Sequence, residues 1–176
     1  TQHKVRQINH FNQPNFLDDC VIALCEDTHG NLWIGSRLGI YVESTDGRFH
    51  TAAEWLGYAT PFDQTYVFDI CCDKAGDVWI ASNGQGILHI RTADGTWRQY
   101  TRDNGMISDH VYCLQADDTG CIWAGTFADG LAVRIPSEGS FKAVSVFPNL
   151  ENKGIGNIAR DENGRMWITT NNSVFS

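Results

Sequence analysis

The chain has 176 residues, of which 42% are hydrophobic and 19% charged, so it is long and apolar enough for one folded domain. Its formal net charge of −8 argues against a nucleic-acid-binding protein and against a protein that adheres to anionic membranes. No run of residues approaches the ~18 apolar residues of a membrane span, so we expect no direct membrane contact in this segment.

The predicted elements begin with one isolated strand and continue as four repeats of a longer unit. Residues 1–16 are predicted to hold an outer strand, over Val5–Ile8, and a connection. The repeats follow at residues 17–59, 60–103, 104–148 and 149–176, and the last repeat lacks its own fourth strand. We therefore treat residues 1–176 as a single repeat region.

One motif, Asp-x-x-Gly-x-hydrophobic-Trp, marks the centre of every repeat. Its tryptophans are 46, 44 and 44 residues apart, a regularity that chance does not produce. The residues that carry the motif are Asp27, Gly30, Trp33, Asp73, Gly76, Trp79, Asp117, Gly120, Trp123, Asp161, Gly164 and Trp167. The aspartate can accept bonds from turn amides and the glycine can take a positive φ angle, so the motif predicts a hairpin. We assign these recurring residues to structure rather than to chemistry.

Around this motif, each repeat is predicted to contain four short strands. An apolar stretch such as Tyr66–Cys71 precedes the motif, and stretches such as Gly86–Ile90 and Trp97–Tyr100 follow it, each bounded by turn residues. In the tryptophan strand, Trp33 and Ile34 point to opposite faces, so the sheet must be covered on both sides. Four-stranded units of this length that are apolar on both faces are typical of propeller blades.

We therefore predict an all-β fold, a β-propeller with four repeats of a four-stranded antiparallel blade. Two forms stay open: a slice of a larger propeller, or a closed four-bladed ring in which the N-terminal strand completes the last blade. A slice leaves apolar blade faces exposed at both ends. Further propeller blades or another copy of the chain are then expected to cover those faces.

The unit resembles the two-component regulator propeller repeat, most closely over Leu24–Ser36 and nearly as well over Leu114–Thr126. The fourth unit departs from the pattern, with Thr169 and Ser173 where glycines would recur. The resemblance implies a periplasmic ligand-sensing propeller of a Bacteroides-type hybrid histidine kinase. It further implies recognition of glycan-derived ligands, a phosphorelay, and regulated transcription of polysaccharide-use genes. By the same resemblance this chain is not itself an enzyme, although its full-length parent would be a histidine kinase.

Two other classes stay open, a propeller enzyme resembling a lyase or glycosidase and a protein-interaction scaffold. An enzyme predicts single-copy acids or bases at the mouth of the propeller, where only Asp63, Asp109 and His110 fall. We assign no catalytic residue, no metal ligand and no cofactor, because the six histidines show no ligand spacing. The six cysteines are expected to pack as small apolar side chains, with a Cys25–Cys71 link as a minor alternative.

The predicted ligand site lies in loops that differ between repeats. In a four-stranded meander, the loops before the first strand and between the second and third strands emerge on one face. Variable loops on a rigid scaffold are where recognition usually occurs, and amides, charged groups and aromatic rings suit an oligosaccharide or another small ligand. The candidate ligand-binding residues are Arg37, Tyr66, Asn83, Gln85, Phe127 and Asp129.

Overall fold

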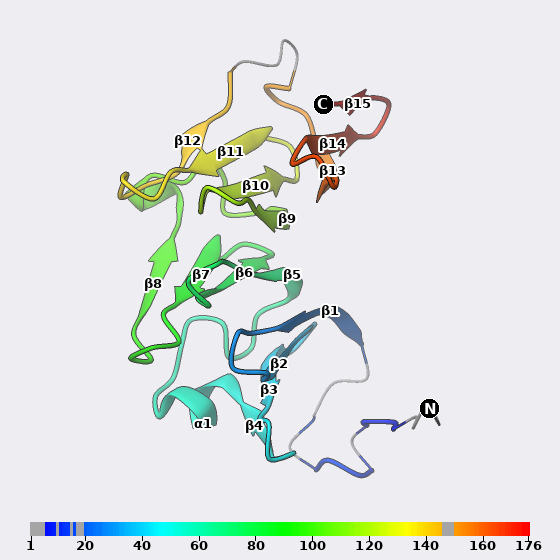
Figure 1. Ribbon diagram of the computed structural model, residues 1–176, viewed down its shortest axis with the longest axis vertical. Coiled ribbons are helices and arrows are strands. Elements are labelled where there is room, and N and C mark those ends of the chain that lie inside the picture. Colours follow the sequence, from blue (N-terminus) through cyan, green and yellow to red (C-terminus); the bar gives the residue numbers. More distant parts are fainter. Residues whose placement is uncertain (1–5, 10, 15, 17–19, 146–149) are drawn as a thin grey trace.

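The computed structural model describes residues 6–9, 11–14, 16, 20–145 and 150–176, and its architecture is all-β (Figure 1). Its strands form four separate antiparallel sheets, which we call blades 1 to 4 in chain order. The predicted fold class is therefore confirmed. Within the described residues, neither helical segment has the length or apolar character that a membrane crossing requires.

Blades 1 to 3 have four strands each and blade 4 has three. Blade 1 contains β1 (Val21–Glu26), β2 (Leu32–Ser36), β3 (Gly39–Glu43) and β4 (Phe49–Thr51). Blade 2 contains β5 (Val67–Cys72), β6 (Val78–Ser82), β7 (Ile87–Ile90) and β8 (Trp97–Tyr100). Blade 3 contains β9 (Val111–Ala116), β10 (Ile122–Thr126), β11 (Leu131–Arg134) and β12 (Lys142–Ala143), and blade 4 contains β13 (Ile155–Arg160), β14 (Met166–Thr170) and β15 (Val174–Phe175). A short helix, α1 (Ala52–Leu56), follows blade 1, and a 3₁₀ turn, η1 (Arg102–Asn104), follows blade 2.

The Asp-x-x-Gly motif forms the hairpin between the first two strands of each blade. In blade 1, Asp27 Oδ1 accepts hydrogen bonds from the amides of His29 and Asn31, both at 2.9 Å. Gly30 has a φ angle of +84°, a conformation that side chains with a Cβ rarely adopt. The other carboxylate oxygen, Asp27 Oδ2, accepts from Trp33 Nε1 at 2.9 Å. One aspartate thus fixes both the turn and the orientation of the tryptophan.

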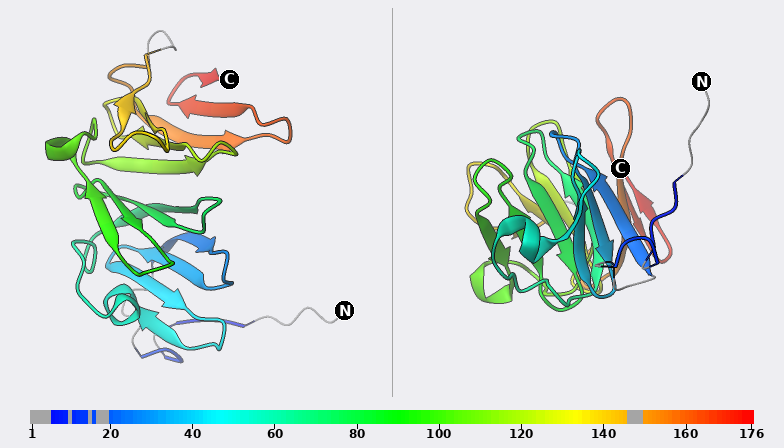
Figure 2. Two further views of the ribbon diagram at one scale, coloured as in Figure 1. Left: turned by 60° about the vertical axis from the view of Figure 1, so that its left-hand side comes forward. Right: turned by 90° about the horizontal axis from the view of Figure 1, so that it is seen from below.

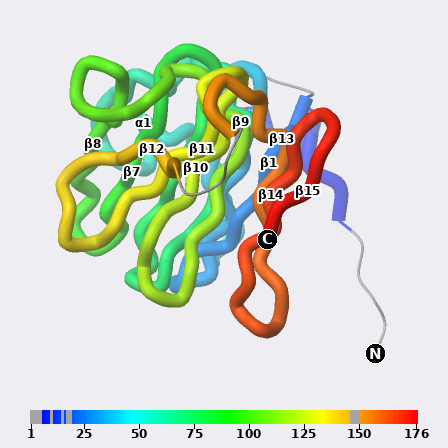
Figure 3. The backbone as a smooth tube through the Cα atoms, turned by 90° about the horizontal axis from the view of Figure 1, so that it is seen from above, coloured from blue at the N-terminus to red at the C-terminus, as the bar shows by residue number. Residues whose placement is uncertain are grey.

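The blades stand side by side in an open arc (Figure 2). The closest contacts between neighbouring blades join their first strands, β1 to β5, β5 to β9, and β9 to β13. Viewed along the stack, these first strands gather on one side and the outer strands β8 and β12 on the other (Figure 3). The first strands therefore form the inner edge of the arc.

Apolar clusters fill the spaces between blades. Trp33 of blade 1 is completely buried among residues of blade 2 such as Ile70 and Ile80, and Trp79 is buried in the same way against blade 3. Trp123 packs, partly buried, on the cluster between blades 3 and 4. These three tryptophans thus pack between neighbouring blades.

The two ends of the arc differ from its interior. Leu24 of blade 1 is 60% exposed, whereas Ile70, at the same position of blade 2, is 5% exposed because blade 1 covers it. Trp167 of blade 4 is 38% exposed, because within the described residues no further sheet packs on it. The far face of blade 1 is partly covered by Phe16, which packs on Tyr41.

The described residues contain no closed ring. The strand predicted over Val5–Ile8 falls partly outside the described residues, since Val5 is not among them, and residues 6–9 form no strand. Arg6 instead makes an ion pair with Glu43 of β3. The sheet of blade 4 runs β13-β14-β15, without a strand from the N-terminal segment. This arrangement corresponds to a propeller slice rather than to the four-bladed ring.

Candidate functional site

Every blade has an irregularity at the same place in its first strand. The pairing of the first two strands shifts by one residue near Val21 in blade 1, near Val67 in blade 2 and near Ile155 in blade 4. A matching shift interrupts the pairing of β9 with β10 in blade 3. Such bulges redirect a side chain away from the regular alternation of a strand. The redirected residues are Ile22, Phe68, Tyr112 and Gly156.

The bulges of blades 2 and 3 bring aromatic rings together at the inner edge of the arc. Phe68 and Tyr112 stack with their ring centroids 4.4 Å apart and an interplanar angle of 21°. Phe127, in the turn after β10, continues the stack on Tyr112 at 5.6 Å and 19°. Tyr66 packs on the other side of Phe68 at 4.8 Å. We call Tyr66, Phe68, Tyr112 and Phe127 the aromatic row.

Two hollows adjoin the aromatic row. The first, of about 320 Å³, is lined by Phe68, Asn83, His110, Tyr112 and Phe127. The second, of about 490 Å³, lies on the other side of Tyr112 and Phe127 and extends to Gly156 and Asn171 of blade 4. Since Gly156 occupies the bulge position of blade 4, no ring continues the row there. Phe127 is 61% exposed and Tyr112 is 37% exposed, so both present ring surface to a ligand.

A polar pair borders the first hollow. Asn83 Oδ1 and His110 Nδ1 are 2.8 Å apart, and their backbones form an isolated antiparallel bridge. Backbone bonds tie this pair to the row, because the Asn83 amide donates to the Tyr66 carbonyl and the Phe127 amide to the His110 carbonyl, both at 3.0 Å. The hollow thus combines aromatic faces with side-chain amide and imidazole groups, which can exchange hydrogen bonds with hydroxyl groups of a ligand.

The structure brings together three of the six predicted ligand-binding residues. Asn83 and Phe127 line the first hollow, and Tyr66 belongs to the aromatic row. Gln85 instead pairs with Gln99 of β8, whose Nε2 donates to Gln85 Oε1 at 3.2 Å. These placements leave the ligand-binding role of every residue a prediction.

The remaining two predicted residues lie elsewhere. Arg37 is exposed in the β2–β3 turn, next to Leu38. Leu38 lines a separate hollow of about 470 Å³ between blade 1, α1 and the segment that leads to β5. Asp129 makes an ion pair with Arg102 at 2.8 Å, which joins η1 to blade 3. Hydrogen bonds from Ser108 and then from Arg102 hold the pKa of Asp129 below its usual range.

Sequence reasoning missed Phe68, Tyr112 and His110. Phe68 and Tyr112 lie inside predicted strands, where regular alternation places aromatic residues in the core. His110 was noted only as a candidate acid or base. The available signal was the alignment of the repeats, which places Ile22, Phe68, Tyr112 and Gly156 at one common position.

The three candidate acids and bases of the enzyme alternative each have hydrogen-bond partners within the protein. Asp63 accepts hydrogen bonds from the amide and the hydroxyl of Thr60 at 3.0 and 2.9 Å. Asp109 Oδ1 accepts from the Arg102 amide at 2.8 Å, and His110 pairs with Asn83. The two aspartates therefore stabilise loops in the described structure.

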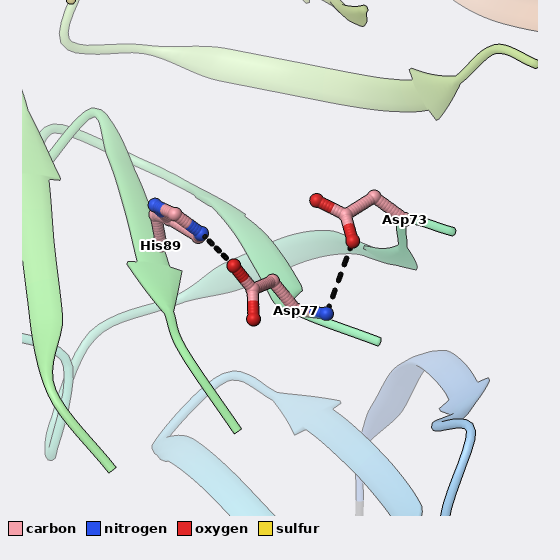
Figure 4. Close-up of side chains that lie close together, drawn as sticks. All are labelled: Asp73, Asp77 and His89. Carbon is pink, nitrogen blue, oxygen red and sulfur yellow. Dashed lines mark hydrogen bonds and ion pairs between the residues drawn. The ribbon is translucent and has the colours of Figure 1, made fainter. Parts of the chain in front are cut away.

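A second polar cluster lies at the β5–β6 hairpin, at the end of the blade 2 strands that is opposite to the aromatic row (Figure 4). Asp73, Asp77 and His89 place candidate ligand atoms within 4.8 Å of one another. His89 Nε2 is 2.9 Å from Asp77 Oδ2, and the imidazole ring stacks on Trp79 at 3.7 Å. Burial lowers the pKa of His89 despite this hydrogen bond to Asp77.

Protein donors already engage the carboxylate of Asp73. Its Oδ1 atom accepts from the amides of Ala75 and Asp77, and its Oδ2 atom accepts from Trp79 Nε1 at 2.9 Å. The guanidinium group of Arg134 lies over the Trp79 ring at 5.1 Å and adds positive charge beside the cluster. We therefore interpret the cluster as a structural His–Asp pair on the repeated hairpin, and assign no metal to it.

Comparison with sequence families gives one match that spans the repeats. A family model described as "two component regulator propeller" matches residues 15–37, 61–84, 105–128 and 149–172. Together these segments include more than half of the chain, and each contains one Asp-x-x-Gly-x-hydrophobic-Trp motif. Among curated proteins, no sequence matches the chain significantly.

Comparison with solved structures finds chains whose fold is similar to that of this protein. The extracellular domain of the putative hybrid two component system BT3049 from B. thetaiotaomicron matches with a TM-score of 0.79 and 20% identity. That match covers 97% of this chain and 23% of the domain, so the chain spans about a quarter of it. The corresponding domain of BT4673 from B. thetaiotaomicron matches with a TM-score of 0.68 and 20% identity, over 88% of this chain and 20% of that one.

A propeller enzyme also matches. Virginiamycin B lyase from Staphylococcus aureus has a TM-score of 0.68 and 20% identity, over 88% of this chain and 51% of that one. At such low identities, these likenesses establish the fold alone.

Proposed function

The chain belongs to the two component regulator propeller family, and we propose that it is part of the extracytoplasmic, ligand-sensing propeller of a hybrid two-component system. Support comes from the family and from the two solved extracellular domains of hybrid two component systems whose fold it shares. The proposed location is the periplasm. In this role the segment binds and does not catalyse.

The observation that carries the proposal is the aromatic row. The repeat motif requires a tryptophan in each blade, but it does not require an aromatic residue at the bulge. Phe68 and Tyr112 nevertheless stack there, and Phe127 extends the stack to the mouths of two hollows. Phe127 ends the stack and is its most exposed ring. An exposed ring beside hydrogen-bonding groups is suited to sugar rings, whose apolar faces stack while their hydroxyl groups exchange hydrogen bonds.

We propose a glycan-derived oligosaccharide as the ligand. Phe127 and Tyr112 are the exposed rings of the row, so a chain of sugar units could stack on Phe127, pass the edge of Tyr112 and reach the polar pair Asn83–His110. Ligand binding would then shift the arrangement of the full sensor toward the state that drives its histidine kinase. The resulting phosphorelay would regulate transcription of polysaccharide-use genes.

We further propose that the exposed ends of the arc are covered in the full sensor. Leu24 and Trp167 lie at positions that neighbouring blades bury in the interior of the arc. The fitting cover for each is a further propeller blade, or the equivalent face of another copy of the chain.

The test is calorimetric titration of the chain with oligosaccharides released from xylan, pectin, arabinan, β-glucan and starch. The proposal predicts that at least one class binds, and that Tyr112→Ala and Phe127→Ala each weaken binding roughly tenfold or more, a change of about 1.4 kcal/mol or more. Phe127 is the ring that stacks on the ligand, and Tyr112 holds the Phe127 ring in place.

The matched controls are exposed aromatic residues away from the row, Tyr58→Ala and Phe11→Ala. These variants are expected to bind as the unaltered chain does. Absence of binding to every class, or equal losses in the row and control variants, would contradict the proposal.

A further inference from the structure

Two cysteines on the first strands of blades 1 and 2 lie in direct contact. Cys25 of β1 and Cys72 of β5 have their Sγ atoms 2.8 Å apart. Both side chains are half-buried and pack on the apolar cluster between the two blades. A short movement of either side chain would therefore bring the sulfur atoms to bonding distance.

The two contacting cysteines do not occupy equivalent positions in their blades, but positions that differ by one residue. Cys25 and Cys71 occupy equivalent positions, so the link between them that the sequence left open would join two residues that point the same way. Because alternate residues of a strand face opposite sides, Cys72 points back toward blade 1, whereas Cys71 packs on the cluster between blades 2 and 3. The sulfur partner of Cys25 is thus Cys72.

We propose that Cys25 and Cys72 are a redox-active pair that forms a disulfide bond between blades 1 and 2 when the protein meets a disulfide oxidant. The pair then becomes a covalent staple at the inner edge of the arc, where the blades approach most closely.

The reaction is a thiol–disulfide exchange in two steps. The Cys25 thiolate attacks one sulfur of the oxidant, and the other sulfur leaves as a thiolate that takes up a proton. Cys72 then loses its proton and attacks Cys25 Sγ, which releases the second oxidant sulfur as a thiol. Two protein thiols are oxidised and one oxidant disulfide is reduced to two thiols.

The environment of the pair favours this order. The hydrogen bond with Cys72 lowers the pKa of Cys25, and the same bond together with burial raises the pKa of Cys72. Cys25 is thus the better thiolate and Cys72 the resolving thiol. In the cell, the reaction depends on the oxidising compartment proposed above, whereas the geometry of the pair does not.

The test is oxidation of the purified chain with glutathione disulfide, followed by thiol counting and intact mass. We expect the six thiols to fall by two, with the loss of two hydrogen atoms in mass and a monomer on a non-reducing gel. Cys25→Ala is expected to keep its five thiols, and Cys72→Ala to stop at a mixed disulfide between Cys25 and glutathione, seen as one lost thiol and an added glutathionyl mass. Cys71→Ala is expected to form the internal disulfide as the unaltered chain does. The oxidised chain is expected to melt roughly 5 °C or more above the reduced chain.

Blade 3 offers a matched control for the offset. Ala116 occupies the position in blade 3 that Cys72 occupies in blade 2. It packs on the same cluster as Cys71, so a cysteine at this position would face Cys71 as Cys72 faces Cys25. The A116C variant is therefore expected to lose four thiols on oxidation instead of two. Retention of all six thiols, disulfide-linked dimers, or a disulfide that persists in Cys25→Ala would each overturn the proposal, and none of these results bears on glycan binding.

Discussion

The first and the fourth blade contain the same hairpin in different surroundings. Trp33 Nε1 donates to Asp27 at 2.9 Å, and Trp167 Nε1 donates to Asp161 at 3.0 Å. Trp33 is nevertheless completely buried, whereas Trp167 is 38% exposed. The hydrogen bond is therefore set within the hairpin, and burial is added by the next blade.

This comparison separates two sources of stability. The local source is the turn with its Asp–Trp bond, which every blade makes alone. The second source is the apolar contact between blades, which an end blade makes on one side only. Substitutions at equivalent positions should therefore have unequal effects when a neighbouring blade covers one of the two positions and not the other.

The largest difference is expected at the tryptophans. Trp33→Ala removes a fully buried ring from the cluster between blades 1 and 2, and should lower the free energy of unfolding by about 3–5 kcal/mol. Trp167→Ala should lower it by about 1 kcal/mol or less. Urea denaturation followed by circular dichroism measures both values. Equal losses would mean that the neighbouring blade contributes little.

The next difference is expected on the other face of the sheets. Ile70→Ala opens a cavity between blades 1 and 2 and should cost about 2–4 kcal/mol. Leu24, at the equivalent position of blade 1, is 60% exposed, so Leu24→Ala should cost about 0.5 kcal/mol. The same denaturation experiment compares them. A large loss for Leu24→Ala would show that this face is covered in solution.

A smaller difference is expected at the aspartates. Asp27→Ala leaves the buried Trp33 Nε1 and the turn amides without their acceptor, at a cost of about 2 kcal/mol. Asp161→Ala should cost less, because water can replace the lost acceptor at the exposed Trp167. Thermal unfolding of the two variants measures both losses of stability. Equal losses for Asp27→Ala and Asp161→Ala would contradict the expectation that burial of the tryptophan raises the cost.

The smallest effect is expected from titration of Asp27. Burial raises the pKa of this carboxyl, but hydrogen bonds from Trp33 and Asn31 outweigh burial and hold the pKa below its usual range. Because the pKa in the folded chain lies below the unfolded value of about 3.9, the charged carboxylate stabilises the folded chain at pH values above about 3.9. This stability is lost as the pH falls through the folded pKa. Stability should therefore decline below roughly pH 4, and less steeply in Asp27→Asn.

The half-buried Asp69 acts in the opposite direction in the same experiment. Burial raises its pKa, so its contribution has the opposite sign and strengthens as the pH falls. The difference between the Asp27→Asn variant and the unaltered chain isolates Asp27. If the two chains lose stability in parallel, the hydrogen bonds of Asp27 do not favour its charged form.

The fold could be predicted because its signals are local. The Asp27–Trp33 hairpin lies within seven consecutive residues, and its repetition defines the blades. The predicted strand over Val5–Ile8 needs a partner strand distant in sequence, which is blade 4 in the closed-ring form, and residues 6–9 form no strand. A short sequence likeness to Trp97–Tyr100 carries no information about such a partner.

The candidate site could be predicted only in part. Asn83 and Phe127 directly follow predicted strands, so their place in the turns between the second and third strands could be predicted. Phe68 and Tyr112 were not, because a one-residue bulge turns them from the core toward the inner edge of the arc. A bulge of this kind leaves no mark in the hydrophobic pattern of a single strand.

The central claim is that repeated residues build the propeller while the bulge residues recognise the ligand. The most direct measurement is the dissociation constant of the tightest-binding oligosaccharide of the five-polysaccharide panel, determined for Tyr112→Ala and Trp167→Ala. We predict that Tyr112→Ala weakens binding roughly tenfold or more with little change in stability, and that Trp167→Ala leaves it unchanged. Unchanged binding in Tyr112→Ala, or an equal loss in Trp167→Ala, would contradict the claim.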